Sequence, residues 1–86
     1  MVQILWDKKE NQAVALDEEK VIGICEFIEE KDTWNIIHTE VDESFQGQGI
    51  AKELVLEVIK NAKKEEKKVI ADCSYAKKIL EQKSIE

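Results

Sequence analysis

The chain has 86 residues, of which 43% are hydrophobic, and a formal net charge of −6 at pH 7. This length and hydrophobic content predict one small domain over residues 1–86. The acidic charge argues against nonspecific binding to nucleic acid or to an anionic membrane, because both need a cationic protein surface.

The sequence offers little indication of a targeting segment, a disulfide framework or a metal site. The apolar run at residues 1–5 is too short for a signal peptide, and no segment approaches the length of a membrane span. Cys25 and Cys73 lie far apart without a histidine cluster, which disfavours both a disulfide framework and a metal site. We therefore expect a cytoplasmic protein with no bound metal, as a monomer or weak homo-oligomer.

The first half of the chain has the alternation and composition of strands. We predict a short lead-in strand at 2–6 and further strands at 12–16, from 20 to 27 or 28, and at 33–41, separated by charged, turn-prone segments. Because the breaks between the last three are short, these strands are expected to form an antiparallel meander.

The pattern changes to helical spacing after Gly49. Apolar residues at 50, 54, 55, 58, 59 and 62 predict an amphipathic helix that ends in the charged run 63–68. That run is interpreted as a solvated helix end. A basic binding patch is the less favoured alternative, because Glu65 and Glu66 dilute its lysines.

A strand at 69–73 and a short helix at 74–80 follow, and residues 84–86 are expected to fray. The helix between the strands 33–41 and 69–73 implies that these strands are parallel. The prediction is an α+β domain with a mixed sheet, in which an antiparallel β-meander is followed by a β-α-β unit and a short C-terminal helix.

The segment from Gln46 to Ala51, which we call the glycine loop, lies between the strand 33–41 and the long helix. Glycines allow the backbone to take positive φ and to approach a ligand closely, and the N–H groups at a helix start favour phosphate. Because the whole chain is acidic, a phosphate site must depend on these amides and on nearby lysines, with Lys52, Lys77 and Lys78 as candidates. An ordinary glycine turn is the alternative.

Three motifs together resemble a known family. Gln46-x-x-Gly49-x-Ala51 is similar to the Gln/Arg-x-x-Gly-x-Gly/Ala signature of the GNAT superfamily of acetyltransferases. The runs His38-Thr39-Glu40-Val41 and Cys73-Ser74-Tyr75 resemble segments of very small GNAT-like proteins that consist of little more than the acetyl-CoA-binding half. The chain departs from these relatives at its end, where it has no proline.

The resemblance implies that acetyl-CoA binds at the glycine loop, with backbone amides around its pyrophosphate. The expected cofactor-binding residues are Val41, Gln46, Gly47, Gln48, Gly49, Ile50, Ala51, Lys52, Cys73, Tyr75 and Lys77.

Four residues are candidates for catalysis. Glu40 and His38 share one face of their strand and could act as the general base that deprotonates an amine. Cys73 stands beside a helix start and could be a nucleophile, although a strand cysteine is more often a packing residue. Tyr75 could protonate the leaving thiolate, by its similarity to a tyrosine of many GNAT enzymes, or simply pack.

The function implied is an acetyl-CoA-dependent N-acetyltransferase that acts on an amine acceptor, either a small molecule or a lysine. The alternative is a CoA- or acyl-CoA-binding module, or a partner subunit, without turnover. A purely structural domain would require the glycine loop to be accidental.

Overall fold

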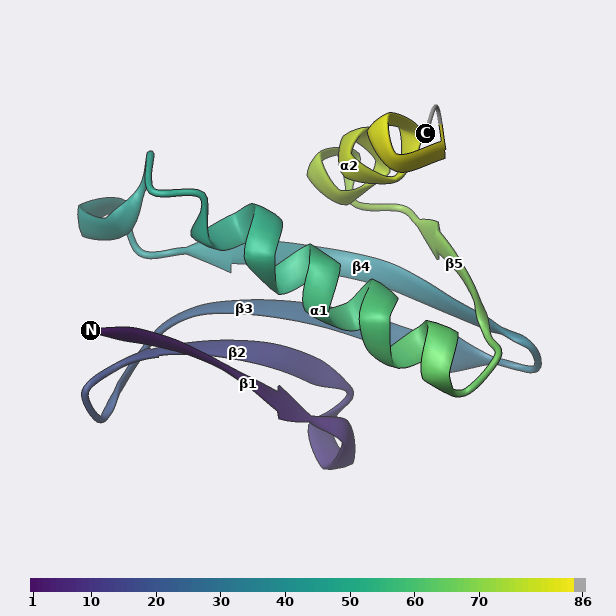
Figure 1. The fold of residues 1–86 in the computed structure, drawn as a ribbon, viewed down its shortest axis with the longest axis horizontal. Coiled ribbons are helices and arrows are strands. Elements are labelled where there is room, and N and C mark those ends of the chain that lie inside the picture. Colours follow the sequence, from purple (N-terminus) through teal and green to yellow (C-terminus); the bar gives the residue numbers. More distant parts are fainter. Residues whose placement is uncertain (85–86) are drawn as a thin grey trace.

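The computed structural model describes residues 1–84, which form a five-stranded mixed sheet with two α-helices on it (Figure 1). The strands are β1 (Val2–Asp7), β2 (Gln12–Asp17), β3 (Lys20–Glu30), β4 (Thr33–Val41) and β5 (Lys68–Ala71). The helices are α1 (Ile50–Lys64) and α2 (Ser74–Ser84), and the short 3-10 helices η1 (Lys8–Glu10) and η2 (Glu43–Phe45) follow β1 and β4. The predicted α+β class is confirmed.

The sheet has the order β1-β2-β3-β4-β5. β1 to β4 pair antiparallel, so the lead-in strand joins the predicted meander as its outer member. β5 pairs with β4 in parallel after the α1 crossover, as predicted. This topology places the glycine loop at the end of β4 and the start of α1.

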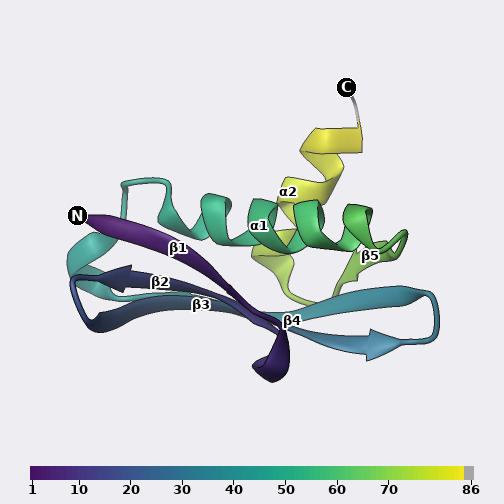
Figure 2. The same ribbon diagram turned by 60° about the horizontal axis from the view of Figure 1, so that its bottom comes forward.

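Both helices lie on the same side of the sheet, as Figure 2 shows, and the opposite face is open. α1 buries Leu54, Val55 and Val58 completely, and it packs against small side chains on β2, Ala13 and Ala15. Close approach also requires Gly23 on β3, because a Cβ there would lie 3.2 Å from Leu54 Cδ1 and 3.1 Å from the carbonyl oxygen of Glu40. The core thus fixes the position of α1 on the sheet.

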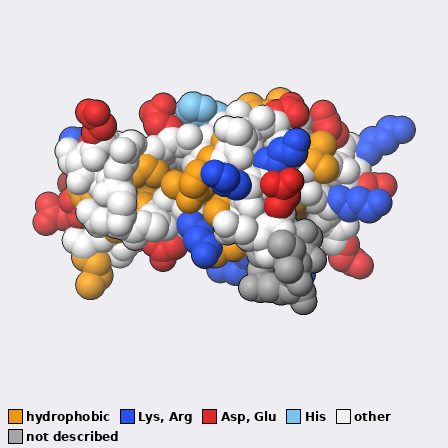
Figure 3. Space-filling view, turned by 90° about the horizontal axis from the view of Figure 1, so that it is seen from above, with side chains coloured by type: hydrophobic (Ala, Val, Ile, Leu, Met, Phe, Trp, Pro, Cys, Tyr) orange, Lys and Arg blue, Asp and Glu red, His pale blue; other side chains and the backbone are white. Residues whose placement is uncertain are grey.

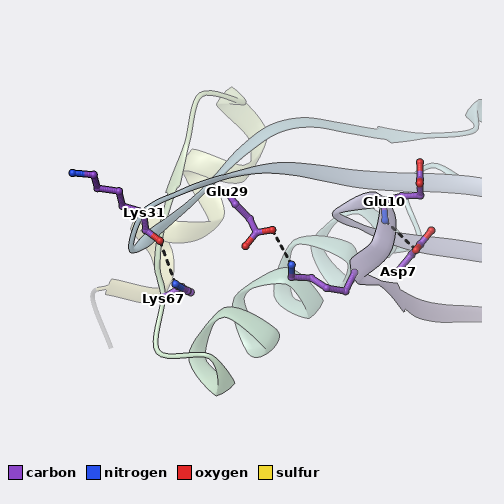
Figure 4. A network of polar contacts seen from close by, with 6 residues as sticks. Asp7, Glu10, Glu29, Lys31 and Lys67 are labelled. Atoms are coloured by element: carbon purple, nitrogen blue, oxygen red, sulfur yellow. Dashed lines mark hydrogen bonds and ion pairs between the residues drawn. The ribbon is translucent and has the colours of Figure 1, made fainter.

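Three aromatic rings, those of Trp6, Phe27 and Trp34, stack on one another. The Phe27 ring lies 4.3 Å from that of the fully buried Trp34 and 5.5 Å from that of Trp6. Lys8 covers Trp34 at 5.6 Å and forms a 2.8 Å ion pair with Glu29 (Figure 4). The hydrogen bond from Lys8 lowers the pKa of Glu29.

Three predicted boundaries were wrong by two residues or more. β3 continues to Glu30 because Glu29 and Glu30 pair with Trp34 and Thr33 across the hairpin. β5 stops at Ala71, before the predicted end at 73. α2 runs on to Ser84, whereas residues 85 and 86, also expected to fray, lie outside the described part of the chain.

None of the helices in residues 1–84 combines the length and the apolar character needed to cross a bilayer.

Candidate functional site

A cleft of about 460 Å³ opens where β4 ends, between the glycine loop and the start of α2. Its walls come from β4, from η2 with the glycine loop and the first turn of α1, and from α2: Thr39, Val41, Phe45, Gln46, Gly47, Gly49, Ile50, Ala51 and Tyr75. Figure 3 looks onto this side of the molecule, where hydrophobic atoms are exposed between the lobe at the left and the centre. The volume lies in the range of small-molecule sites.

The glycine loop has the backbone geometry of an anion site. Gly47 and Gly49 have φ of 82° and 78°, values that L side chains rarely adopt, and a Cβ on either would meet no atom within 4 Å. Gly49 is the N-cap of α1, and no side chain caps this helix end. Because the first N–H groups of a helix have no partner within it, those of α1 are available to an anion at the loop.

The cleft exists because β4 and β5 separate. The β3–β4 register shifts between Glu26 and Phe27, which pair with His38 and Ile36, so Ile37 is an extra residue in β4. Such a bulge bends a strand. β4 and β5 stay paired only from Thr33 to Ile36, and beyond it the edge of β4 at residues 37–41 pairs with no strand of residues 1–84 on this side.

Where the β4–β5 pairing ends, backbone and side-chain hydrogen bonds hold the residues before α2 against β4. The carbonyl oxygen of Ile36 accepts hydrogen bonds from the N–H groups of both Asp72 and Cys73, at 3.0 and 3.2 Å. Buried Asn35 also binds Asp72, donating from Nδ2 to a carboxylate oxygen at 3.0 Å and accepting the Asp72 N–H at 3.1 Å. These contacts fix the start of α2 relative to β4.

Cys73 lies immediately before α2 and next to Thr39. Its Sγ lies 3.5 Å from Thr39 Oγ1, and that hydroxyl lies 3.6 Å from the Sγ of Cys25. Burial raises the pKa of Cys73, but hydrogen bonds from the N–H groups of Ala76 and Tyr75 and from Thr39 outweigh it, so the pKa is below its ordinary value. The same hydroxyl contact does not offset burial at Cys25, whose pKa rises to about 11.

Most, but not all, of the predicted cofactor residues lie at the cleft. Seven of them are walls of the cleft: Val41, Gln46, Gly47, Gly49, Ile50, Ala51 and Tyr75. Cys73 is not a wall residue but contacts the wall residue Thr39. Gln48 and Lys52 are exposed and are not among the cleft walls. Lys77 lines a different groove, described below, so its role toward the cofactor stays a prediction.

The predicted catalytic residues do not converge. His38 Nε2 lies 3.2 Å from Glu40 Oε1, so the expected shared face is correct. Their cross-strand neighbours Glu26 and Ile24 alternate with the core residues Cys25 and Phe27, so the pair lies on the open face of the sheet. Cys73 and Tyr75 lie on the helix side of β4, because Cys73 contacts Thr39 and Tyr75 lines the cleft.

Thr39 is a site residue that we did not predict. By the strand period of two it faces opposite to His38 and Glu40 and on the same side as Val41, which was predicted. That alternation was the signal available in the sequence. Among residues 1–84, no group of three His, Cys, Asp or Glu side chains could hold a metal ion.

A family model described as GCN5-related N-acetyltransferase matches residues 12–85. No match was found among curated proteins.

Solved structures described as GCN5-related, GCN5-like or GNAT family proteins are also similar to this chain. A GCN5-like protein from Staphylococcus aureus, solved by NMR, shares 30% sequence identity over 96% of this chain and 81% of its own, with a TM-score of 0.74. A GNAT family acetyltransferase from Elizabethkingia anophelis with acetyl-CoA bound shares 28% identity over 85% of this chain, with a TM-score of 0.67. A GCN5-related N-acetyltransferase from Sphaerobacter thermophilus, 23% identical over 72% of this chain with a TM-score of 0.68, shares the fold. The chain spans 51% of the Elizabethkingia protein's length and 21% of the Sphaerobacter protein's.

Proposed function

This chain belongs to the GCN5-related N-acetyltransferase family, and on that premise we propose that it binds acetyl-CoA in the cleft and transfers the acetyl group to an amine. The observation that carries the proposal is the glycine loop, with an uncapped helix start and two positive-φ glycines at the wall of a cleft. The structure of the Elizabethkingia relative with acetyl-CoA bound supports the choice of ligand.

The residues present fit a pyrophosphate at the loop. The free N–H groups of the first turn of α1 donate to anionic oxygens, and the helix dipole favours negative charge at this end. The open space above Gly47 and Gly49 leaves room for the oxygens. Lys52 adds one cation in the same turn, although Glu53 beside it opposes that charge. Recognition therefore depends mainly on the backbone.

The unpaired edge of β4 offers a second set of contacts. Between Ile37 and Val41 the N–H and C=O groups of β4 that do not bond to β3 face the gap, so a ligand arm with amide groups can bind there as a strand would. Acetyl-CoA supplies an acetyl thioester, which a deprotonated amine can attack. An arm along β4 would hold the thioester near Thr39, Cys73 and Tyr75.

The acceptor amine must lose a proton before it attacks, and the open face of the sheet supplies the bases. We propose that the amine approaches from that face, reaches the thioester through the gap beside β4, and gives its proton to Glu40, which is hydrogen-bonded to His38, directly or through water. Tyr75 donates a proton to the leaving thiolate in this scheme. Cys73 offers the less favoured route, in which its sulfur accepts the acetyl group first.

Gly49→Val tests the loop. A β-branched residue at a φ of 78° is strained by about 1 to 3 kcal/mol, and its side chain would occupy the space proposed for phosphate. We expect a folded protein that gives no heat with acetyl-CoA in a calorimetric titration at concentrations that saturate the wild type. Gln48→Ala is the matched control, because it removes a neighbouring side chain and keeps the amide. Unchanged affinity in Gly49→Val would refute the loop as the binding site.

The non-catalytic CoA-binding module remains a second candidate, favoured by the position of His38 and Glu40 on the far face of β4 from the cleft. Release of free thiol from acetyl-CoA, measured against a panel of amines and polyamines, separates the two functions. For the enzyme we expect release that falls in Glu40→Gln while acetyl-CoA affinity is kept. Binding without thiol release from any acceptor would favour the module.

A further inference from the structure

A second groove, of about 520 Å³, lies between the C-terminal end of α1, β5 and α2. Apolar and lysine side chains dominate its walls: Ile59, Lys63, Lys67, Val69, Lys77, Leu80 and Glu81. We call it the lysine groove. Its three α2 residues lie about half a turn around the helix from Tyr75, so α2 separates this groove from the cleft.

The lysines come together only in three dimensions. Lys63 is in the last turn of α1, Lys67 is in the turn before β5, and Lys77 is on α2. Glu65 and Glu66, which dilute the charged run in the sequence, are not among the groove walls. Glu81 is the acidic wall residue. The tertiary structure thus joins two lysines of the charged run 63–68 to Lys77 in one locally basic site.

The apolar part of the groove is accessible. Ile59, Val69 and Leu80 are each half-buried, so they expose apolar surface between the lysines. Figure 3 shows lysine side chains in the centre and at the right of this face, with hydrophobic and some acidic atoms among them. Apolar residues inside a charged rim are typical of a protein interface.

The part of the chain that contains all the groove residues is less acidic than the part before it. Residues 1–47 contain 12 acidic side chains and 4 lysines, whereas residues 48–86 contain 9 lysines and 7 acidic side chains. A partner that is attracted here must be acidic, and it must be narrow enough to avoid the acidic part of the molecule. We propose that the lysine groove docks an acidic amphipathic helix of a partner protein.

This occupant fits better than the other anionic ones. A third helix can place its apolar face on Ile59, Val69 and Leu80 and its carboxylates beside the lysines. A membrane surface is flat and would meet the whole acidic molecule as well as the groove. Nucleic acid binding needs more phosphate contacts than three lysines supply, against a net charge of −6.

One lysine must be kept in the test. Lys67 Nζ donates to the carbonyl oxygen of Lys31 at 3.2 Å, which joins the turn before β5 to the β3–β4 turn (Figure 4). Replacing it would disturb the fold as well as the charge. Lys63 and Lys77 are exposed, so charge reversal there changes the groove with little effect on the core.

The probe is a fluorescein-labelled peptide of about 14 residues, with leucines at i, i+3, i+4 and i+7 and glutamates elsewhere. Its comparator has the same composition, with the leucines dispersed around the helix. We expect the amphipathic peptide to bind about tenfold more tightly by fluorescence anisotropy, and to shift the amide signals of Ile59, Val69 and Leu80.

The double variant Lys63→Glu with Lys77→Glu should weaken binding about tenfold or more. The control is the double variant Lys9→Glu with Lys20→Glu. It has the same net charge as the groove variant, but its changes lie at exposed positions outside the groove, so it should have little effect on peptide affinity. Saturating acetyl-CoA should leave the peptide affinity unchanged, because α2 separates the two sites. This expectation sets aside the contact of Lys77 with the cofactor that the sequence predicts, because Lys77 lines the lysine groove and not the cleft. This result does not depend on whether the protein acetylates anything.

Other outcomes would overturn the proposal. These are no peptide binding, equal affinity for the dispersed peptide, equal weakening in the control pair, or displacement by acetyl-CoA. Binding of phosphatidylserine vesicles through Lys63 and Lys77 without peptide binding would assign the groove to a membrane and would also reject it. Circular dichroism of each variant checks that the fold is retained.

Discussion

At the scale of single residues, Thr39 connects two cysteines that have opposite chemistry. Its hydroxyl lies within 3.6 Å of both sulfur atoms. Cys25 is fully buried with a pKa raised to about 11, whereas Cys73 is partly exposed with a lowered pKa. Because reactivity follows the thiolate and its exposure, we expect Cys73 to be the more reactive thiol of the pair.

Thr39→Val should raise the pKa of Cys73, because it removes a hydroxyl that stabilises the thiolate and leaves a side chain of similar shape. The rate of alkylation by iodoacetamide at neutral pH should fall several-fold, and the midpoint of its pH profile should move up. Thr39→Ser keeps the hydroxyl and should restore the wild-type profile. Identical profiles in all three proteins would show that Thr39 does not stabilise the thiolate.

At the scale of elements, the divergence of β4 and β5 decides where the cleft lies. β4 has an extra residue, Ile37, directly after its pairing with β5 ends, and Asn35 holds Asp72 at the same place. The paired β4–β5 segment covers four residues of each strand, so these side-chain bonds carry much of the constraint on the start of α2.

Asn35→Ala should destabilise the domain by about 1 to 3 kcal/mol, because it removes two hydrogen bonds to Asp72 and leaves polar groups unpaired. Urea unfolding followed by circular dichroism measures the change. Asp72→Asn, which keeps a side-chain oxygen that can accept from Asn35, is the control and should lose less. If both variants are as stable as the wild type, the Asn35 contacts do not hold the two elements together.

Some element boundaries were predictable and others were not. The period of Ile50, Leu54, Val55 and Val58 predicts α1 correctly, because a single apolar stripe faces the sheet. The end of β5 was wrong because it depends on a partner strand: the N–H groups of Asp72 and Cys73 both turn to Ile36. Local propensity contains no information about such a contact.

At the scale of the whole molecule, one core joins the sheet to both helices. The buried cluster includes residues from β2, β3, β4, α1 and α2, such as Ala15, Phe27, Trp34, Leu54 and Ile79. We therefore propose that residues 1–86 behave as one domain.

This predicts a single cooperative unfolding transition. Tryptophan fluorescence reports Trp6 and Trp34 next to Phe27, and far-ultraviolet circular dichroism reports both helices and sheet. The two signals should give coincident curves in urea. For a monomer, the midpoint should also be independent of protein concentration. Separate transitions would contradict one domain, and a midpoint that rises with concentration would contradict a monomer.

The sequence by itself determined the family, the class of fold and the glycine loop. The family was indicated by the resemblance of three motifs to known proteins, whereas the class of fold and the loop follow from local signals: glycines that permit positive φ, a strand before them and an amphipathic helix after them. It also determined that His38 and Glu40 share a face, because strand side chains alternate.

Only the tertiary structure decided which side chains meet across the chain. It placed Thr39 between Cys25 and Cys73, put His38 and Glu40 on the face away from the cleft, and gathered Lys63, Lys67 and Lys77 into one groove. The physical reason is that these arrangements depend on a one-residue bulge in β4 and on the packing of α2 between the cleft and the lysine groove. Neither leaves a periodic signal in the order of residues.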